Sequence, residues 1–290
     1  MAEVVLQGKY SFETAEGLNI YRLAAPDVDE ESIRRVGGRF GLAGTIDAGT
    51  FVSNRRSLSY SEPSGWGLQL FRDSGGWKYL DATRWQAHDG AGDLDIEDDE
   101  AEALARDVVV ANEVADASTL ELERVERLHV AHSSRDGSGH EEYTAGARVL
   151  LRRVVDGIST VGPGGRTIVY LDAERALTGV EHLWHEIESV HAPVQGLREL
   201  DDAFEEIRAR YQNGDGRAEV FDVSLGYYEQ GFDGRQEFLQ PAYVFLLRLT
   251  SPDPRFRINA SAAVSAAINA PVPVEAPVSP PAAQPARSAE

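Results

Sequence analysis

The chain has no cysteine among its 290 residues. Without thiols it can form neither disulfides nor thiolate metal sites, and it has no cysteine nucleophile, although this does not identify its compartment. Lysine is almost as scarce, with only Lys9 and Lys78, while arginine is abundant. A GC-rich coding bias explains that preference as well as physics does.

Long apolar runs are missing too. No window of eighteen apolar residues exists, so we expect no membrane span. The first residues, Met1 to Val5, lack the basic region and the long apolar core of a secretory signal. We therefore expect a cytoplasmic protein, or an exported one if an upstream segment has been removed.

Basic clusters are the third absence. The net charge is −20, and arginines gather only in local pairs such as Arg152-Arg153. A nucleic-acid partner needs a basic surface to neutralise phosphates, so we expect none. A protein partner or a hydrophobic small molecule fits this composition better.

Three segments show helical periodicity of apolar residues. They lie at Asp27 to Gly41, Glu97 to Asn112 and Leu197 to Tyr211, and each is followed by strand-like segments with hairpin-type turns. This order predicts an α+β fold in which antiparallel sheets are each packed by a helix.

The predicted fold divides into two tandem lobes and a tail. We place an N-terminal α+β lobe at 1–92 and a C-terminal α+β lobe at 93–268. Residues 269–290 hold six of the thirteen prolines, interleaved with alanine and serine. Such a segment buries little, so a disordered or polyproline-like tail is expected, with a docking peptide or a linker as alternatives.

Two stretches carry a resemblance to a known family. Val155-Asp156-Gly157-Ile158-Ser159-Thr160-Val161-Gly162, followed by Leu171-Asp172, lies within Arg148–Glu186. Leu225-Gly226-Tyr227-Tyr228-Glu229 precedes Gln236–Phe245. Both resemble PepSY and pro-segment-like domains, including YycH/YycI-type regulatory proteins, although Ser159 stands where that family usually has proline. The resemblance implies a PepSY-like second lobe with a binding or regulatory role, and it supplies no catalytic residue.

The densest group of chemically active side chains is His182-Leu183-Trp184-His185-Glu186. A zinc-protease helix needs histidines four residues apart with a glutamate between them, a spacing that is absent here, so we expect no metal. On a strand, His182, Trp184 and Glu186 share one face. They form either a polar ligand-facing or partner-facing surface, or simply a half-exposed strand.

Aromatic residues near the C-terminus form the second candidate group. Tyr227, Tyr228 and Tyr243 either make cross-strand pairs in a core or line a pocket together with Glu229. If they line a pocket, the four tryptophans are the side chains to examine with them, namely Trp66, Trp77, Trp85 and Trp184.

Three further motifs have simpler explanations. The histidines around Ser133–Gly139 fit an exposed hairpin tip, and Gly162-Pro163-Gly164-Gly165 fits a tight turn rather than a phosphate cradle. The acidic run from Asp93 to Glu100 lacks the ligand spacing of a calcium loop and suits the start of a helix.

No well-spaced catalytic set emerges, so the catalytic residues are unknown and no cofactor is expected. The favoured hypothesis is a non-catalytic binding or regulatory module that recognises a protein segment or a hydrophobic ligand through a sheet face. The alternative is a cofactor-free, cyclase-type enzyme that acts on a hydrophobic small molecule. A purely structural protein is a third class.

Overall fold

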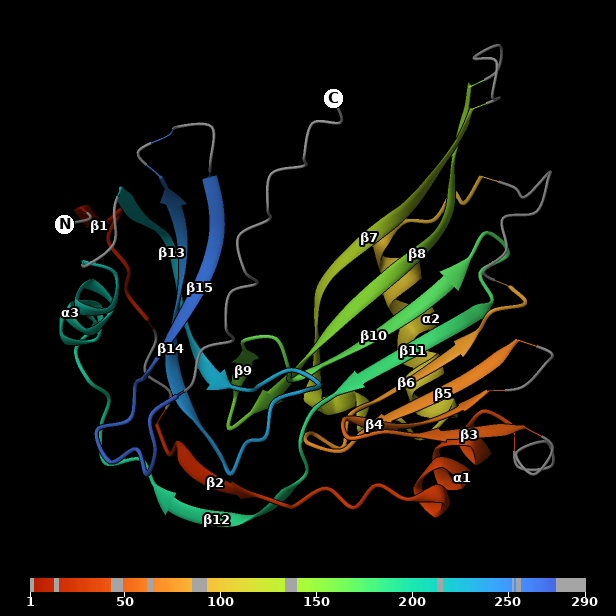
Figure 1. Cartoon of the computed structure of the whole chain (residues 1–290), viewed down its shortest axis with the longest axis horizontal. Coiled ribbons are helices and arrows are strands. Elements are labelled where there is room, and N and C mark those ends of the chain that lie inside the picture. Colours follow the sequence, from red (N-terminus) through yellow and green to blue (C-terminus); the bar gives the residue numbers. More distant parts are fainter. Residues whose placement is uncertain are drawn as a thin grey trace, which may run out of the picture.

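The computed structural model describes residues 3–12, 16–42, 49–61, 65–84, 93–133, 140–212, 216–251, 253 and 257–274. Within these ranges the protein is mainly β. Strands take 49% of it and helices 17%, and fifteen strands join into one mixed sheet (Figure 1). The predicted α+β fold, with a helix packed on each of several antiparallel sheets, is therefore wrong.

Eight of the strands form what we call the large layer. They are antiparallel and run in the order β3 (Thr50–Ser53), β4 (Ser57–Ser61), β5 (Trp66–Phe71), β6 (Trp77–Asp81), β11 (Leu177–Leu183), β10 (Arg166–Asp172), β8 (His140–Val155) and β7 (Leu120–Ser133). Helices α1 (Glu30–Arg39) and α2 (Asp98–Ala111) pack against this layer (Figure 1), and a short 3-10 helix, Ala117–Thr119, precedes β7.

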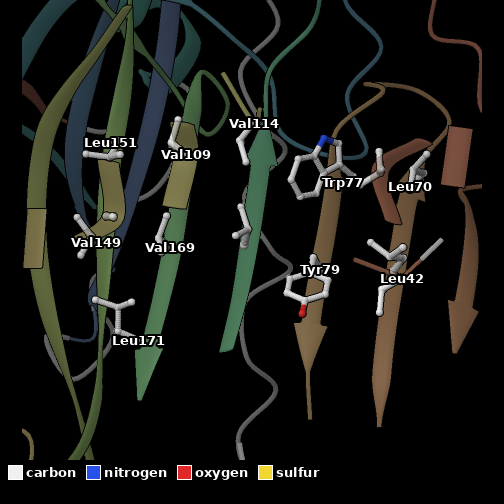
Figure 2. Close-up of a cluster of buried hydrophobic side chains, with 14 of the residues drawn as sticks. Leu42, Leu70, Trp77, Tyr79, Val109, Val114, Val149, Leu151, Val169 and Leu171 are labelled. Carbon is white, nitrogen blue, oxygen red and sulfur yellow. The ribbon is translucent and has the colours of Figure 1, made fainter. Parts of the chain in front are cut away.

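Alternation along the strands builds the core of the large layer. Val149 and Leu151 on β8 point to the helix side, where they meet Val109 of α2 (Figure 2). On β6, Trp77 and Tyr79 occupy the same side in front of α1. Because alternate residues of a strand point to the same side, the apolar residues at every second position place one face of the large layer against the helices.

Six of the seven remaining strands form the small layer. It contains β13 (Arg217–Tyr228), β14 (Phe238–Thr250) and β15 (Arg257–Ser265), flanked by β1 (Glu3–Leu6), β2 (Asn19–Leu23) and β12 (Ile187–Pro193). Helix α3 (Leu200–Tyr211) covers one face (Figure 1), with Phe204 and Ile207 packed against Phe245 of β14.

A single hairpin joins the two layers. Strand β8 turns through Asp156 and Gly157 into β9 (Ile158–Val161), which pairs in parallel with the end of β13. Both turn residues have positive φ, +49° and +77°, as a tight two-residue hairpin requires. The layers therefore diverge from this point as two arms of one sheet (Figure 1).

Pairing between distant segments explains why the predicted fold class was wrong. The three helices lie where the periodicity predicts them, but α1 and α2 share one layer. Strand β6 pairs with β11, about a hundred residues later in the chain. Strands from both sides of the predicted boundary at 92/93 thus share one layer, while residues 85–92 lie outside the described ranges.

The beginning of the predicted tail is ordered and partly packed, although residues 271–273 are exposed. Gln240 Nε2 donates to the Val272 carbonyl at 2.7 Å, and the Val274 side chain is only 8% exposed. Residues 275–290 lie outside the described ranges. None of the helices described here is both long and apolar enough to cross a bilayer.

Candidate functional site

A cleft of about 370 Å³ lies where the chain crosses between the layers. Its walls come from five places: the linker between β2 and α1, one face of α1, the β5–β6 hairpin, Val114 after α2, and the end of β11 with the residues that follow it. We call it the α1 cleft. The residues used below are Ser32, Arg35, Arg39, Ser74, Trp77, His182, Trp184 and Glu186.

Helix α1 presents one side to the cleft, with Ser32, Arg35 and Arg39 spaced by three and four residues. The helix begins at this point because Asp29 caps it, accepting from the Ser32 backbone N–H at 2.8 Å. Ser32 Oγ also donates to Asp29 Oδ1, and the two hydrogen bonds from Ser32 lower the pKa of Asp29. The cap fixes where the helix starts and so determines which residues face the cleft.

Two arginines give the α1 cleft its charge. The Arg35 guanidinium reaches Ser32 Oγ at 3.4 Å, and within the described ranges no carboxylate lies within 4.0 Å of either Arg35 or Arg39. Asp27 and Glu186 also line the cleft, but both are exposed. Arg35 is exposed as well, and Arg39 is half-buried, so the cleft carries two cations and two carboxylates that make no ion pair with one another within 4.0 Å.

Another part of the cleft wall is aromatic. The His182 ring lies between Trp77 and Trp184, with centroid distances of 5.4 and 4.3 Å. Its Nδ1 lies 2.9 Å from Thr167 Oγ1, across the β10–β11 pair. Burial, then the charges of Arg153 and Arg39, lower the pKa of His182 to about 3. The ring is therefore neutral near pH 7 and a weak base.

A buried ionic network lies behind this aromatic wall. Glu229, at the end of β13, is fully buried, and its Oε2 lies 3.5 Å from Arg153 Nη1. Its Oε1 accepts from the His185 backbone N–H and lies 3.3 Å from His185 Nδ1. Arg153 also donates to the His185 carbonyl at 3.0 Å and stacks over Trp184 at 4.7 Å.

This network holds the linker between β11 and β12 in place. It joins the ends of β8 and β13 to the backbone of His185, so it positions the neighbouring Trp184 in the cleft wall. Charges buried this deeply persist only when they are paired. The sequence indicated no site role for Arg153 and suggested His185 only as a metal ligand. Arg153 precedes His185 by 32 positions, and Glu229 follows it by 44. Contacts over such separations leave no local signal in the sequence.

The structure brings some of the predicted site residues together. His182, Trp184 and Glu186 all line the α1 cleft, and Glu229 supports it from behind. Trp77 joins them, while Trp85 and the side chain of Trp66 lie outside what is described.

The three predicted tyrosines lie elsewhere. Tyr227 is buried and donates to Asp156 Oδ2 at 2.6 Å, where Tyr21 also donates to the same carboxylate. Tyr243 belongs to the core beneath α3, and its hydroxyl donates to the Arg198 carbonyl. Tyr228 faces the other side of β13, and burial raises its pKa to about 12.

The remaining motifs adopt structural roles where they are described. Asp98, Asp99 and Glu100 form the first turn of α2, as expected of an acidic helix start. The Gly162–Gly165 turn accepts Arg152 Nη1 at two of its carbonyls. No group of three or more metal-binding side chains occurs in the described part of the chain, and residues 134–139 lie outside it.

Comparison with known proteins supports the fold alone. No family model matches the chain, and no curated protein matches it. Among solved structures, the chain is similar to an uncharacterized protein from Eubacterium rectale, with a TM-score of 0.52 and 10% identity. The match covers 89% of this chain and 85% of that one, so the similarity extends across both layers.

Proposed function

We propose that the protein is a non-catalytic binding module whose α1 cleft holds a small ligand with an anionic group beside a flat apolar group. The observation that carries this proposal is the position of Arg35 and Arg39. They stand one helical turn apart on α1 and line the same cleft as Trp77 and Trp184. No carboxylate of the described chain forms an ion pair with either arginine within 4.0 Å, although Asp29 is close enough for the charge of Arg35 to lower its pKa.

The chemistry of both walls fits such a ligand. A guanidinium binds carboxylate or phosphate through paired hydrogen bonds, and a half-enclosed cleft strengthens them relative to water. Indole rings offer flat apolar surface for the rest of the ligand. Because a net charge of −20 repels anions at long range, recognition depends on these short contacts.

The cleft is better suited to binding than to catalysis. His182 is buried, neutral and bonded to Thr167, so it is a poor general base. Ser32 Oγ donates to the Asp27 carbonyl, and Ser74 Oγ accepts from the Gly76 N–H. Ser32 Oγ also donates to Asp29 Oδ1 at 2.9 Å, but the hydrogen bonds from Ser32 hold the pKa of Asp29 below its usual value, so this carboxylate is a weak base. Among the described residues, no hydrogen bond joins Ser74 Oγ to a basic side chain.

The cyclase-type enzyme has weaker support. It would need an enclosed aromatic cavity, whereas Tyr227 and Tyr243 pack into two different cores. The PepSY-like regulatory role remains a proposal. A binding module whose cleft wall is held by the buried ionic network is compatible with it, but the α1 cleft suits a small ligand better than a protein segment laid on a sheet face.

The test compares an aryl carboxylate with its neutral amide. Binding of 2-naphthoate and 2-naphthamide is measured by calorimetry on the full chain and on the Arg35→Gln/Arg39→Gln variant. We expect the double variant to bind the carboxylate at least tenfold more weakly and the amide unchanged, since only the charged contact is lost. A tenfold change corresponds to about 1.4 kcal/mol.

Arg34 provides the matched control. It lies on the same helix, is exposed, and pairs with Glu30 at 3.4 Å outside the cleft. Arg34→Gln should therefore leave both affinities unchanged. Equal loss in the Arg34 variant, or no loss in the cleft variant, would refute recognition by this pair of arginines.

A further inference from the structure

The large layer has a second face, which points away from α1 and α2. Val149 and Leu151 on β8 face the helices, so Arg152, at the next position, faces the other side. On the neighbouring strand β10 (Figure 1), Arg166 lies directly opposite Arg152 in the antiparallel register, and the two side chains therefore share this face. Like charges in directly opposed positions destabilise a sheet, so this pair needs an explanation.

Arg152 is held by contacts within the chain. Its Nε lies 2.7 Å from Glu123 Oε2, and its Nη1 donates to the carbonyls of Gly162 and Gly164 at 3.0 and 2.8 Å. Only 16% of its side chain is exposed. Arg152 thus has its own partners, and they fix its position beside β10.

Arg166 has no such partners. Within the described ranges its guanidinium makes no hydrogen bond and has no carboxylate within 4.0 Å, and its Nε is buried. The side chain is half-buried, and burial, followed by the charge of Arg152, lowers the pKa of Arg166. A charge withdrawn from water normally needs a partner of opposite sign, which the described chain does not supply here.

The neighbouring carboxylates are already paired with other cations. The two whose charge acts on Arg166 are Glu123 and Glu181. Glu123 Oε1 accepts from Arg124, and Glu181 Oε1 lies 3.1 Å from Lys78 Nζ. Arg124 also adds its own positive charge to the surroundings of Arg166. Arg166 is therefore a cation in excess on this face.

Packing explains the stem of Arg166 but not its charge. Leu150 and Ile168 share this face of the sheet and are only 1% and 5% exposed. The long stem of an arginine can cover such apolar neighbours. An uncharged side chain of similar length would cover them as well, so the guanidinium requires a separate reason.

We propose that Arg166 is the centre of an anion site on this face, which binds a phosphate-type oxyanion, either free or as part of a phosphate ester. Its guanidinium offers N–H donors in the planar fork that fits such an oxyanion through paired hydrogen bonds. The bound anion offsets the repulsion between Arg166 and Arg152. The site is distinct from the α1 cleft, which lies on the helix side of the large layer.

Thermal unfolding in sodium phosphate, compared with sodium chloride of equal ionic strength, tests the site. All proteins carry Arg35→Gln/Arg39→Gln in the full chain, so anion binding in the α1 cleft does not contribute. We expect phosphate to raise the unfolding midpoint, because a ligand that binds only the native state stabilises it. Failure here would leave the naphthoate experiment on the α1 cleft unaffected.

Arg166→Met keeps a long apolar stem and removes the charge. It should abolish the rise in phosphate without lowering the midpoint in chloride, since a cation that faces Arg152 is lost. Calorimetry should show that inorganic phosphate and glycerol phosphate both bind this variant roughly tenfold or more weakly. The tighter of the two probes indicates whether the site takes the free ion or an ester.

Arg208→Met is the matched control. Arg208 is exposed on α3 and pairs with Glu205 at 2.7 Å, so this variant loses the same charge far from β10 and should keep the rise in phosphate. Far-UV circular dichroism verifies that each variant is folded.

Three outcomes would overturn the proposal. One is a midpoint that phosphate does not raise above its value in chloride. Another is an equal rise in Arg166→Met and Arg208→Met, which would reflect the general effect of phosphate on protein unfolding. The third is a lower midpoint of Arg166→Met in chloride together with an unchanged rise in phosphate, because Arg166 would then have a purely structural role.

Discussion

Replacing Glu229 by glutamine tests the buried network behind the α1 cleft. The substitution keeps the shape of the side chain and removes its charge. Arg153, whose side chain is 11% exposed, then loses the carboxylate 3.5 Å away. The amide oxygen can still accept from the His185 N–H, so the change isolates the charge.

The expected cost follows from what Arg153 retains. Removing one partner of a buried pair typically costs roughly 3–5 kcal/mol, because the other charge is left uncompensated. Arg153 keeps its hydrogen bond to the His185 carbonyl and its contact with the Trp184 ring. We therefore expect the lower end, a loss of about 3 kcal/mol in the free energy of unfolding.

A double-mutant cycle separates the pair from its surroundings. Arg153→Met should cost about as much as Glu229→Gln, because it leaves the fully buried carboxylate without its cation. In the double variant neither charge remains, so its loss should be smaller than the sum of the single losses by about 2 kcal/mol. Urea unfolding followed by tryptophan fluorescence and circular dichroism measures all four proteins.

Glu237 supplies the control, since its ion pair with Arg22 at 2.9 Å is half-exposed. Glu237→Gln should change the free energy of unfolding by no more than about 0.5 kcal/mol, as is usual for surface pairs. An effect of Glu229→Gln as small as that, or additive single losses in the cycle, would refute the reasoning.

Three more perturbations have defined outcomes. The pKa of His182, lowered from 6.5 to about 3, makes the native chain less stable as pH falls through that range, because only the unfolded chain takes up the proton. In a pH series of urea unfolding, His182→Phe should remove up to about 1.4 kcal/mol per pH unit of this slope, and an unchanged slope would contradict it. Leu151→Ala, in the core of the large layer, should cost roughly 2–5 kcal/mol in thermal unfolding, against less than about 1 kcal/mol for the half-exposed Leu80→Ala. Asp156→Ala should cost about 1–3 kcal/mol in urea unfolding, because the Tyr21 and Tyr227 hydroxyls lose the carboxylate to which both donate, while Tyr227 keeps the Asn19 carbonyl as an acceptor; no effect would exclude a stabilising role.

Local patterns identified much of the chain correctly. The apolar spacing of Ile33 and Val36 places α1, and the Asp156-Gly157 pair marks the hairpin that joins the layers. The histidine and tryptophan of 182–184 do line a cleft. Each of these features depends on residues within about one helical turn or one hairpin, where sequence spacing translates directly into geometry.

The sequence by itself therefore determined the helix positions, the strand-rich segments and the absence of thiol chemistry. The tertiary structure decided which strands pair, and this pairing overturned the predicted α+β fold. It also decided that Glu229 meets Arg153 and His185, while Tyr227, Tyr228 and Tyr243 separate. The physical reason is range: propensity and periodicity act between neighbours, whereas strand partners and buried charge pairs are selected by the packing of the whole chain.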